Sequence, residues 1–102
     1  MPDLSARLDQ IAVVTTLGSK GARYVDPRQR IEVAAYAVDA VDSTGAGDTF
    51  LGYFLAAVDA GVDIEIALKR ASAAAAIKVS RRGTSSGIPN QTDVAAFQRD
   101  HA

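Results

Sequence analysis

Residues 41–50, VDSTGAGDTF, place a turn of small residues directly ahead of a long apolar segment. The turn itself is GAG at residues 45–47, and Asp48 brings a carboxylate into the first turn of the segment that follows. Residues 46–60 contain only two charged side chains, which predicts a helix that is buried over most of its surface. A glycine turn between a strand and a helix commonly marks the ligand-binding edge of a sheet. The chain is therefore predicted to be an α/β protein with a site at this turn.

Apolar runs separated by turn residues predict the strands. Residues 11–16, IAVVTT, form an uninterrupted and largely β-branched run, which predicts a strand buried on both faces of a helix-covered sheet. Further strands are expected at residues 22–26, 31–34 and 36–41, with a turn over residues 27–29. Because the strands precede the helices and glycine stands where they meet, we expect layers of sheet and helix.

Two more helices are expected after the apolar one, which Gly61 should end. Asp63 is expected to cap a helix through about Val79, and Thr92 is expected to cap a final helix through about Arg99. The first of these two helices is rich in alanine, so a helix, a loop or a flat ligand can approach it closely.

The composition excludes several classes of function. Charged residues make up 23% of the 102 residues and the net charge is −1, so we expect no partner among nucleic acids or anionic membranes. No uncharged apolar run approaches the roughly 20 residues that span a bilayer, and the N-terminus does not resemble a signal peptide. The absence of cysteine excludes disulfides and thiolate metal sites. The sequence thus predicts a single cytoplasmic domain.

Two familiar motifs are present only in outline. GAGDTFLG is similar to the dinucleotide-binding pattern G-x-G-x-x-G, but Phe50 stands at the third glycine position. Residues 83–87, GTSSG, match the G-x-S-x-G pattern of serine hydrolases, but that chemistry needs a histidine base. The only histidine is His101, the second residue from the end, so a hydrolase is not expected.

The turn before residue 48 favours a different chemistry. Backbone N–H groups at the start of a helix have no acceptors within the helix and attract negative charge. Such donors can stabilise charge that develops during a reaction, and a carboxylate one residue further on can accept a proton from a hydroxyl. Together these groups suit phosphoryl transfer to an alcohol. An acid at this position can also serve only to complement the helix dipole, and the local sequence leaves both interpretations open.

At this point the chain resembles a known family. VDSTGAGDTF is similar to the second sequence hallmark of the ribokinase-like (PfkB) carbohydrate kinases, D-T-x-G-A-G-D-x-F. VVTTLGSKGARYV upstream and ALKRASAAAAIKVSRRGTSSGIP downstream resemble the segments that surround ATP in that family, in the same order. The resemblance covers about residues 11–97. It implies a three-layer α/β/α fold, of which residues 1–102 carry the C-terminal, ATP-binding portion.

The resemblance also implies roles for individual residues. Asp48 would be the catalytic base, and the N–H groups of Gly45, Ala46 and Gly47 would form the anion hole for the transferred phosphoryl group. The residues expected to contact the nucleotide are Thr16, Gly18, Gly21, Ala74, Ala75, Gly83 and Thr84. Asp42 and Thr44, together with carbonyl groups of residues 82–87, would bind a monovalent cation, usually potassium. Mg²⁺ would arrive with ATP. Four positions depart from the family pattern: Ser43 replaces the usual threonine, Tyr53 stands where a small residue is usual, Ser72 stands near a position that Asn or His often fills, and Gly87 replaces a serine often seen before Ile-Pro.

Only the C-terminal third of the family is represented in this chain. The N-terminal portion, which supplies most sugar contacts, the lid and the first strands of the sheet, is absent, so an unpaired sheet edge is expected. We therefore expect an ATP-dependent sugar kinase that either lacks its N-terminal portion or self-associates. A nucleoside kinase of the same fold and a non-catalytic nucleotide-binding remnant are the alternatives.

Overall fold

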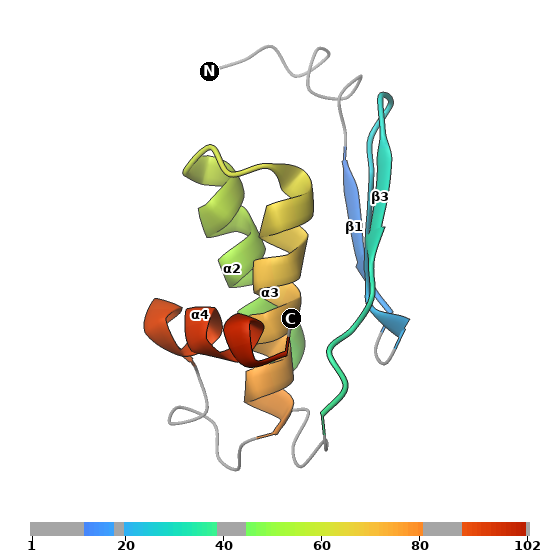
Figure 1. Ribbon diagram of the computed structural model, residues 1–102. Coiled ribbons are helices and arrows are strands. Elements are labelled where there is room, and N and C mark those ends of the chain that lie inside the picture. The colour runs from blue at the N-terminus through green and yellow to red at the C-terminus, as the bar shows by residue number, and fades with distance from the viewer. Residues whose placement is uncertain (1–11, 18–19, 39–44, 81–88, 102) are drawn as a thin grey trace.

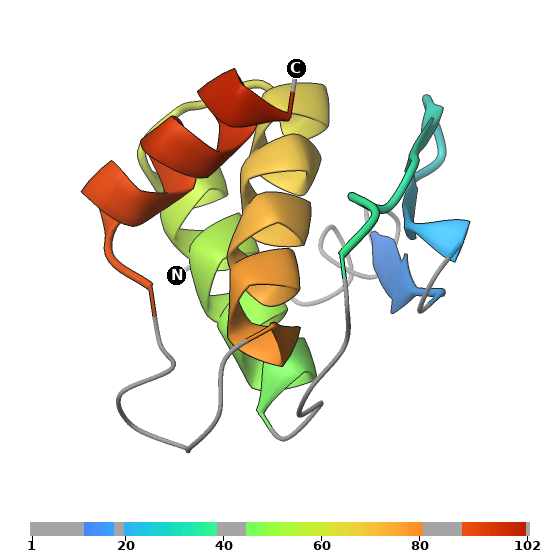
Figure 2. The ribbon, with the colours of Figure 1, turned by 60° about the horizontal axis from the view of Figure 1, so that its bottom comes forward.

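The computed structural model describes residues 12–17, 20–38, 45–80 and 89–101. Their elements are, in chain order, strands β1 (Val13–Thr16), β2 (Ala22–Val25) and β3 (Arg30–Val33) and helices α2 (Ala46–Asp59), α3 (Ile64–Val79) and α4 (Gln91–Asp100). The strands form one layer and the helices another (Figure 1). In the view of Figure 2, α2 lies on the same side of the molecule as β1, and α4 lies on the same side as β3.

The three strands form an antiparallel sheet in the order β1-β2-β3. Val13 lies opposite Val25 in the first pair of strands, and Ala22 lies opposite Val33 in the second. This sheet differs from a parallel α/β sheet because consecutive strands return directly beside one another.

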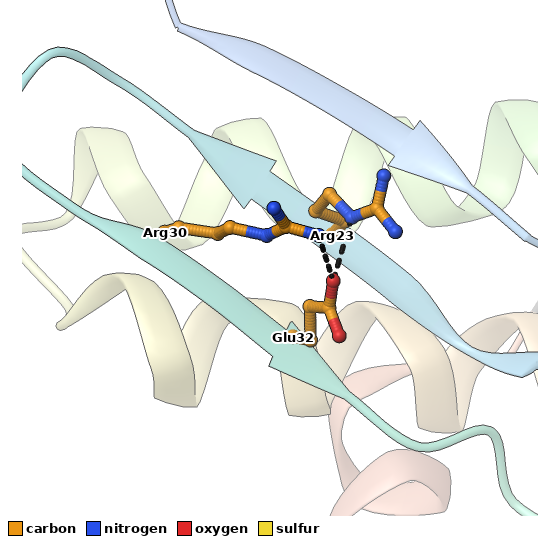
Figure 3. A network of polar contacts seen from close by, with 3 residues as sticks. All are labelled: Arg23, Arg30 and Glu32. Carbon is orange, nitrogen blue, oxygen red and sulfur yellow. Dashed lines mark hydrogen bonds and ion pairs between the residues drawn. The ribbon is translucent and has the colours of Figure 1, made fainter.

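One face of the sheet packs on the helices and the other carries charged side chains. Tyr24 and Val33 are buried in the core that α2 and α3 share with the sheet. On the opposite face, one carboxylate oxygen of Glu32 accepts hydrogen bonds from Arg23 Nε at 2.7 Å and from Arg30 Nη2 at 2.9 Å (Figure 3). These bonds, with that of Arg30 contributing most, lower the pKa of Glu32. The charged face explains why period-two alternation is clear in β2 and β3.

The strand expected at residues 11–16 is present as β1, but its expected burial on both faces is wrong. No residue of β1 is buried, and Val13 is 55% exposed. The helices of the described ranges all lie on one side of the sheet (Figure 1). A continuous β-branched run signals a strand, but whether a second layer covers it depends on the rest of the fold.

The other strand predictions divide into two groups. The strands expected at 22–26 and 31–34 are confirmed within one residue, and so is the turn between them. In that turn the Asp26 N–H donates to the Gln29 carbonyl at 2.9 Å. The strand expected at 36–41 is not formed over residues 36–38, and residues 39–41 lie outside the described ranges. In the described sheet β3 pairs with β2, and residues 36–38 join none of its strands.

The helix boundaries are confirmed more closely than the helix caps. Gly61 follows α2, and Asp63 occupies the N-cap position of α3, although its side chain makes no capping hydrogen bond. The prediction that Thr92 caps the last helix is wrong. Asn90 is the N-cap of α4 and forms a capping box with Asp93, with bonds of 2.8 and 3.0 Å.

Helix α2 is less buried than its apolar composition predicts, so that expectation is also wrong. Its buried residues are Thr49, Phe50, Phe54 and Ala57. These face α3 and the sheet, and the Phe54 ring lies 6.1 Å from the ring of Tyr24. The next stripe around the helix is exposed because no described element packs on it. Composition identifies a helix that can be buried but does not supply the layer that buries it.

Helix α3 is the centre of the molecule. Leu68 and Ala71 belong to the core shared with α2 and the sheet, whereas Ile77 packs with Val94 of α4. Tyr53 of α2 contacts both clusters, and its hydroxyl donates to the Pro89 carbonyl just ahead of α4. A tyrosine at this position therefore joins α2 to the start of α4. None of the helices in the described part of the chain is long and apolar enough to cross a membrane.

Candidate active site

A cavity of about 520 Å³ lies between the sheet and the helices. Four parts of the chain line it: the end of β1 with Gly21 just ahead of β2, the residues after β3, the start of α2 and the second half of α3. Its lining residues are Thr16, Gly21, Ala35, Tyr36, Ala37, Val38, Ala46, Gly47, Phe50, Ser72, Ala75, Ala76 and Val79. Figure 2 turns the lower end of the molecule, with the start of α2 and the end of α3, toward the viewer.

The start of α2 presents backbone donors to this cavity. Gly45 is the N-cap residue and has a left-handed backbone (φ 76°), which glycine adopts without steric cost. The first intrahelical bond runs from Thr49 N–H to the Gly45 carbonyl at 2.9 Å. The N–H groups of residues 46–48 therefore precede the helical ladder, at the positive end of the helix dipole. Ala46 and Gly47 line the cavity, so an anion there would meet them.

Lys78 adds a buried cationic side chain beside this turn. It lies in the last turn of α3 and is only 2% exposed. Its Cε lies 3.5 Å from the point that a Cβ on Gly45 would occupy, so its aliphatic chain packs against the N-cap of α2. The sequence reasoning missed this residue. The signal was a single lysine within an otherwise small and apolar stretch of helix.

Gly21 brings the backbone between β1 and β2 into contact with the segment after β3. It is buried and has φ 104°. A Cβ at this position would lie 1.9 Å from the carbonyl oxygen of Val33 and 2.9 Å from the nitrogen of Ala35. Only glycine fits this close approach, which places Gly21 and Ala35 together on the cavity wall.

Small residues of α3 form the opposite wall. Ser72, Ala75, Ala76 and Val79 are spaced so that they share one helical face, and all four line the cavity. Ala74 faces elsewhere: it is fully buried in the cluster with Ile77 and Val94. Of the two alanines expected at the nucleotide, the structure thus places one on the cavity and the other in the core.

Asp48 lies beside the cavity rather than on its wall. It is exposed in the first turn of α2, one residue after Gly47. From there its carboxylate is accessible to a molecule that approaches the open start of the helix.

The structure brings together only part of the expected site. Thr16, Gly21, Ala46, Gly47 and Ala75 surround one cavity, although the first and the last are 59 positions apart and three elements lie between them. Gly45, Asp48 and Ala74 are described but do not line the cavity. The remaining expected positions fall outside the described residues: Gly18, Asp42, Thr44, residues 82–87 and, within these, Gly83 and Thr84.

The cavity also includes residues that sequence reasoning did not select. Residues 35–38 and Phe50 are the main additions. Residues 36–38 belong to the strand predicted at 36–41, and Phe50 entered the sequence reasoning only as a mismatch to the G-x-G-x-x-G pattern. A strand-like pattern cannot reveal that the chain leaves the sheet and closes a cavity, because that depends on which strands stand beside it.

Sequence comparisons relate this chain to one family. The pattern of the family described as "pfkB family carbohydrate kinase" matches residues 2–91. A deoxyribokinase of Salmonella typhi is 40% identical over 78 residues, which are 76% of this chain and 26% of that enzyme. A ribokinase of Schizosaccharomyces pombe is 42% identical over 84 residues, which are 81% of this chain and 26% of that enzyme. The chain thus spans about a quarter of the length of these relatives.

Solved structures give the same relationship. The crystal structure of a ribokinase from Thermotoga maritima matches with a TM-score of 0.81 and 40% identity, over 86% of this chain and 30% of that one. Arabidopsis thaliana ribokinase, solved with ribose and ATP, matches with a TM-score of 0.80 and 34% identity, over 84% of this chain and 28% of that one. Other neighbours were solved with ATP and Mg²⁺, or with ADP and a calcium or potassium ion. The described elements are thus a portion of a ribokinase-like α/β fold.

Proposed function

Because this chain belongs to the pfkB family of carbohydrate kinases, we propose that it carries the ATP site, the anion hole and the catalytic base of an enzyme that phosphorylates a hydroxyl of a sugar. The observation that carries this proposal is the start of α2, where Ala46 and Gly47 line a cavity and Asp48 follows directly. Backbone donors and a carboxylate at one point suit phosphoryl transfer, in which positioning and charge stabilisation supply most of the catalysis.

The proposed reaction assigns a separate task to each group. The acceptor oxygen attacks the γ-phosphorus of ATP, the bond from this phosphorus to the β–γ bridging oxygen breaks, and ADP leaves. Asp48 takes the proton of the acceptor hydroxyl. The N–H groups of Gly45, Ala46 and Gly47 hold the negative charge of the phosphoryl oxygens. Asp48 can act as the base without occupying the anion position, because its residue follows directly after the N–H groups that would bind the anion.

The residues of the cavity suit a nucleotide. Its wall of small side chains, with Gly21 on one side and Ala75 on the other, leaves room for a flat base. We assign contacts with ATP to these two residues, to Thr16, and to Gly18, Ala74, Gly83 and Thr84 as the family pattern suggests. Ala74 could act only through the position of its helix, because its side chain is buried in the core.

The proposal includes two metal ions: Mg²⁺, which binds with ATP, and potassium, which is assigned by resemblance to the family. Among the described residues no group of three or more His, Cys, Asp or Glu side chains could hold a metal ion, so Mg²⁺ is expected to come with the phosphates. A potassium ion is assigned to Asp42 and Thr44 by resemblance, and a fructokinase of Vibrio cholerae has been solved with ADP and potassium.

The test is phosphate transfer by wild-type protein and by the Asp48→Asn variant. The assay measures phosphorylated product from a panel of sugars and nucleosides in the presence of ATP and Mg²⁺, and ATP affinity is measured separately. Asp48→Asn is expected to lower the transfer rate by at least about 100-fold, because a general base contributes that much. ATP affinity should change less than about twofold, since the base contacts the acceptor. Asp59→Asn, at the far end of the same helix, is the matched control and should keep both properties.

Two results would favour the alternatives. Transfer to nucleosides rather than sugars would indicate a nucleoside kinase, and a nucleoside kinase of Methanocaldococcus jannaschii does match 97% of this chain with a TM-score of 0.81. ATP binding without transfer to any acceptor would indicate a non-catalytic nucleotide-binding portion. Full activity in Asp48→Asn would contradict the assignment of Asp48 as the catalytic base.

A further inference from the structure

The wall of the cavity contains few side chains that can recognise a bound molecule through hydrogen bonds. Among the described residues that line it, only Thr16, Tyr36 and Ser72 have polar side chains, and all three carry a hydroxyl group. None of these lining residues has a charged or an amide side chain. A carboxylate only accepts hydrogen bonds and a guanidinium only donates them, whereas a hydroxyl does either by rotating. The described wall therefore has no side chain with a fixed hydrogen-bonding pattern.

Ser72 has the hydroxyl that is best placed to meet a ligand. It lies in the middle of α3, lines the cavity and is only 8% exposed. A serine within a helix often donates to the carbonyl four residues earlier, but the Ser72 hydroxyl makes no hydrogen bond to a described residue. Because no enclosed side-chain oxygen in this part of the chain lacks a partner, the Ser72 oxygen must be open to the cavity.

The other two hydroxyl groups are less suited to contact a base. The Tyr36 hydroxyl accepts a hydrogen bond from Gln98 Nε2 at 3.5 Å, and its ring meets that of Phe97 edge-on at 5.1 Å. Both contacts turn this side chain toward α4. Thr16 ends β1 and is exposed, so water can satisfy its hydroxyl. Ser72 is therefore the buried polar side chain of the described wall that is available to a base.

The position of Ser72 along the cavity suits a base rather than a phosphate. α3 ends beside the start of α2, since Lys78 packs against Gly45. Ser72 precedes Lys78 by six residues, which places it roughly 9 Å further along the helix axis. With the phosphates at the backbone donors that begin α2, the base would reach the part of the cavity near Ser72, where Ala75 leaves room for it.

A hydroxyl at this point treats the two purines alike. Along one edge adenine presents a donor at N6 and an acceptor at N7, whereas guanine presents acceptors at both O6 and N7. An amide, with one donor end and one acceptor end, matches only the adenine pair, but a hydroxyl can pair with either base. We propose that Ser72 contacts the purine and that this cavity accepts GTP about as well as ATP. This inference rests on the proposed function, because it specifies the phosphoryl donor of the same site.

Nucleotide affinity of the full 102-residue chain tests this inference without relying on phosphate transfer. Calorimetric titrations use ATP, GTP and CTP, each with Mg²⁺. The dissociation constants of ATP and GTP should agree within about fivefold, because each base forms one hydrogen bond with Ser72. That of CTP should be at least about tenfold higher, because a single ring covers less of the apolar wall.

Variants of Ser72 separate a contact with the base from a structural role. Ser72→Ala should weaken ATP and GTP to the same extent, by about three- to tenfold, because each loses one hydrogen bond. Ser72→Asn should instead make the site prefer ATP over GTP by about tenfold, since an amide pairs with adenine at N6 and N7. A merely structural serine would not change the ratio of the two affinities.

Ser80→Ala is the matched control. It removes a hydroxyl at the C-terminal end of the same helix, where this group donates to the Ile77 carbonyl and does not line the cavity. The affinities for all three nucleotides should stay as in wild type. Circular dichroism of each variant checks that its helices persist.

The outcomes distinguish this inference from the proposed function. A preference of wild type for ATP over GTP beyond about fivefold, or equal affinity for CTP, would overturn the inference alone. An unchanged ratio of ATP to GTP affinity in folded Ser72→Asn would also overturn it, because Ser72 would then not contact the base. If wild type binds none of the nucleotides, both the inference and the proposed ATP site are wrong.

Discussion

At Gly21 the backbone leaves no room for any side chain. Its positive φ is unfavourable for other residues, and a Cβ would overlap the carbonyl oxygen of Val33. Gly21→Ala is therefore expected to lower the free energy of unfolding by about 3 kcal/mol or more, from backbone strain and displacement of the segment after β3. Gly52→Ala is the matched control: this glycine lies within α2, and nothing lies within 4 Å of a Cβ there. That change should stabilise the protein by about 0.5–1 kcal/mol, and urea unfolding measures both.

The hydrogen bond from Tyr24 to Asp26 makes a second prediction at this scale. The Tyr24 hydroxyl donates to the carboxylate at 2.6 Å. This bond, with burial as the second cause, raises the pKa of Tyr24 from 10.0 to about 12. The same bond lowers the pKa of Asp26 below 3.8. Because a raised native pKa stabilises only the protonated form, the contribution of Tyr24 is complete below pH 10 and is lost as the pH rises toward 12. The contribution of Asp26 is complete above pH 3.8 and is lost on acidification.

Tyr24→Phe removes this bond and tests its pH dependence. The variant should be less stable than wild type by a constant amount between about pH 5 and pH 9. The difference should shrink below and above that window, as wild type itself loses the bond. Unfolding free energies measured across the pH range check this. If Tyr24→Phe is as stable as wild type at every pH, the ring contact with Phe54, which the variant keeps, and not the hydrogen bond, stabilises this region.

At the scale of single elements, α4 shows how a capping residue is selected. Asn90 and Asp93 exchange hydrogen bonds between side chain and backbone, so this pair, and not Thr92, starts the helix. Asn90→Ala is expected to cost about 1 kcal/mol of stability, while Thr92→Ala should stay within about 0.5 kcal/mol because Thr92 is an exposed residue inside the helix. Thermal unfolding of the two variants compares them directly. If the two variants lose the same stability, Asn90 is not the residue that caps the helix.

The misplaced cap illustrates how far local sequence predicts an element. Asn90, Thr92 and Asp93 all have side chains that can cap a helix, so the start of α4 was predictable to about two residues and no better. The same holds for α2, whose start at Ala46 follows from the glycine turn. The burial of α2 could not be predicted in the same way. Phe50 and Leu51 are both apolar, yet Phe50 is buried and Leu51 is exposed, because only Phe50 faces α3 and the sheet.

At the scale of the whole molecule, the cavity depends on elements that are distant in sequence. Ala75 lines it, whereas Ala95 is exposed on α4, away from it. Ala75→Phe should fill the space proposed for the nucleotide and weaken ATP binding at least about tenfold, while Ala95→Phe should leave it unchanged. Calorimetric titration with ATP and Mg²⁺ measures both. Unchanged affinity in Ala75→Phe would place the nucleotide elsewhere.

The sequence alone determined the family, the bounds of the helices and of strands β2 and β3, and the place of the glycine turn at the start of α2. These follow from local patterns: a hallmark motif, helical periodicity and turn residues, each of which acts within a few positions of the chain. The tertiary structure alone decided that Gly21 and Ala75 share a cavity with Gly47, that Ala74 faces the core, and that Lys78 packs against Gly45. It also decided that Leu51 and Leu55 of α2 are exposed while Phe50 and Phe54 of the same helix are buried. Such features depend on which elements lie next to one another, and burial is a property of neighbours that no short stretch of sequence contains.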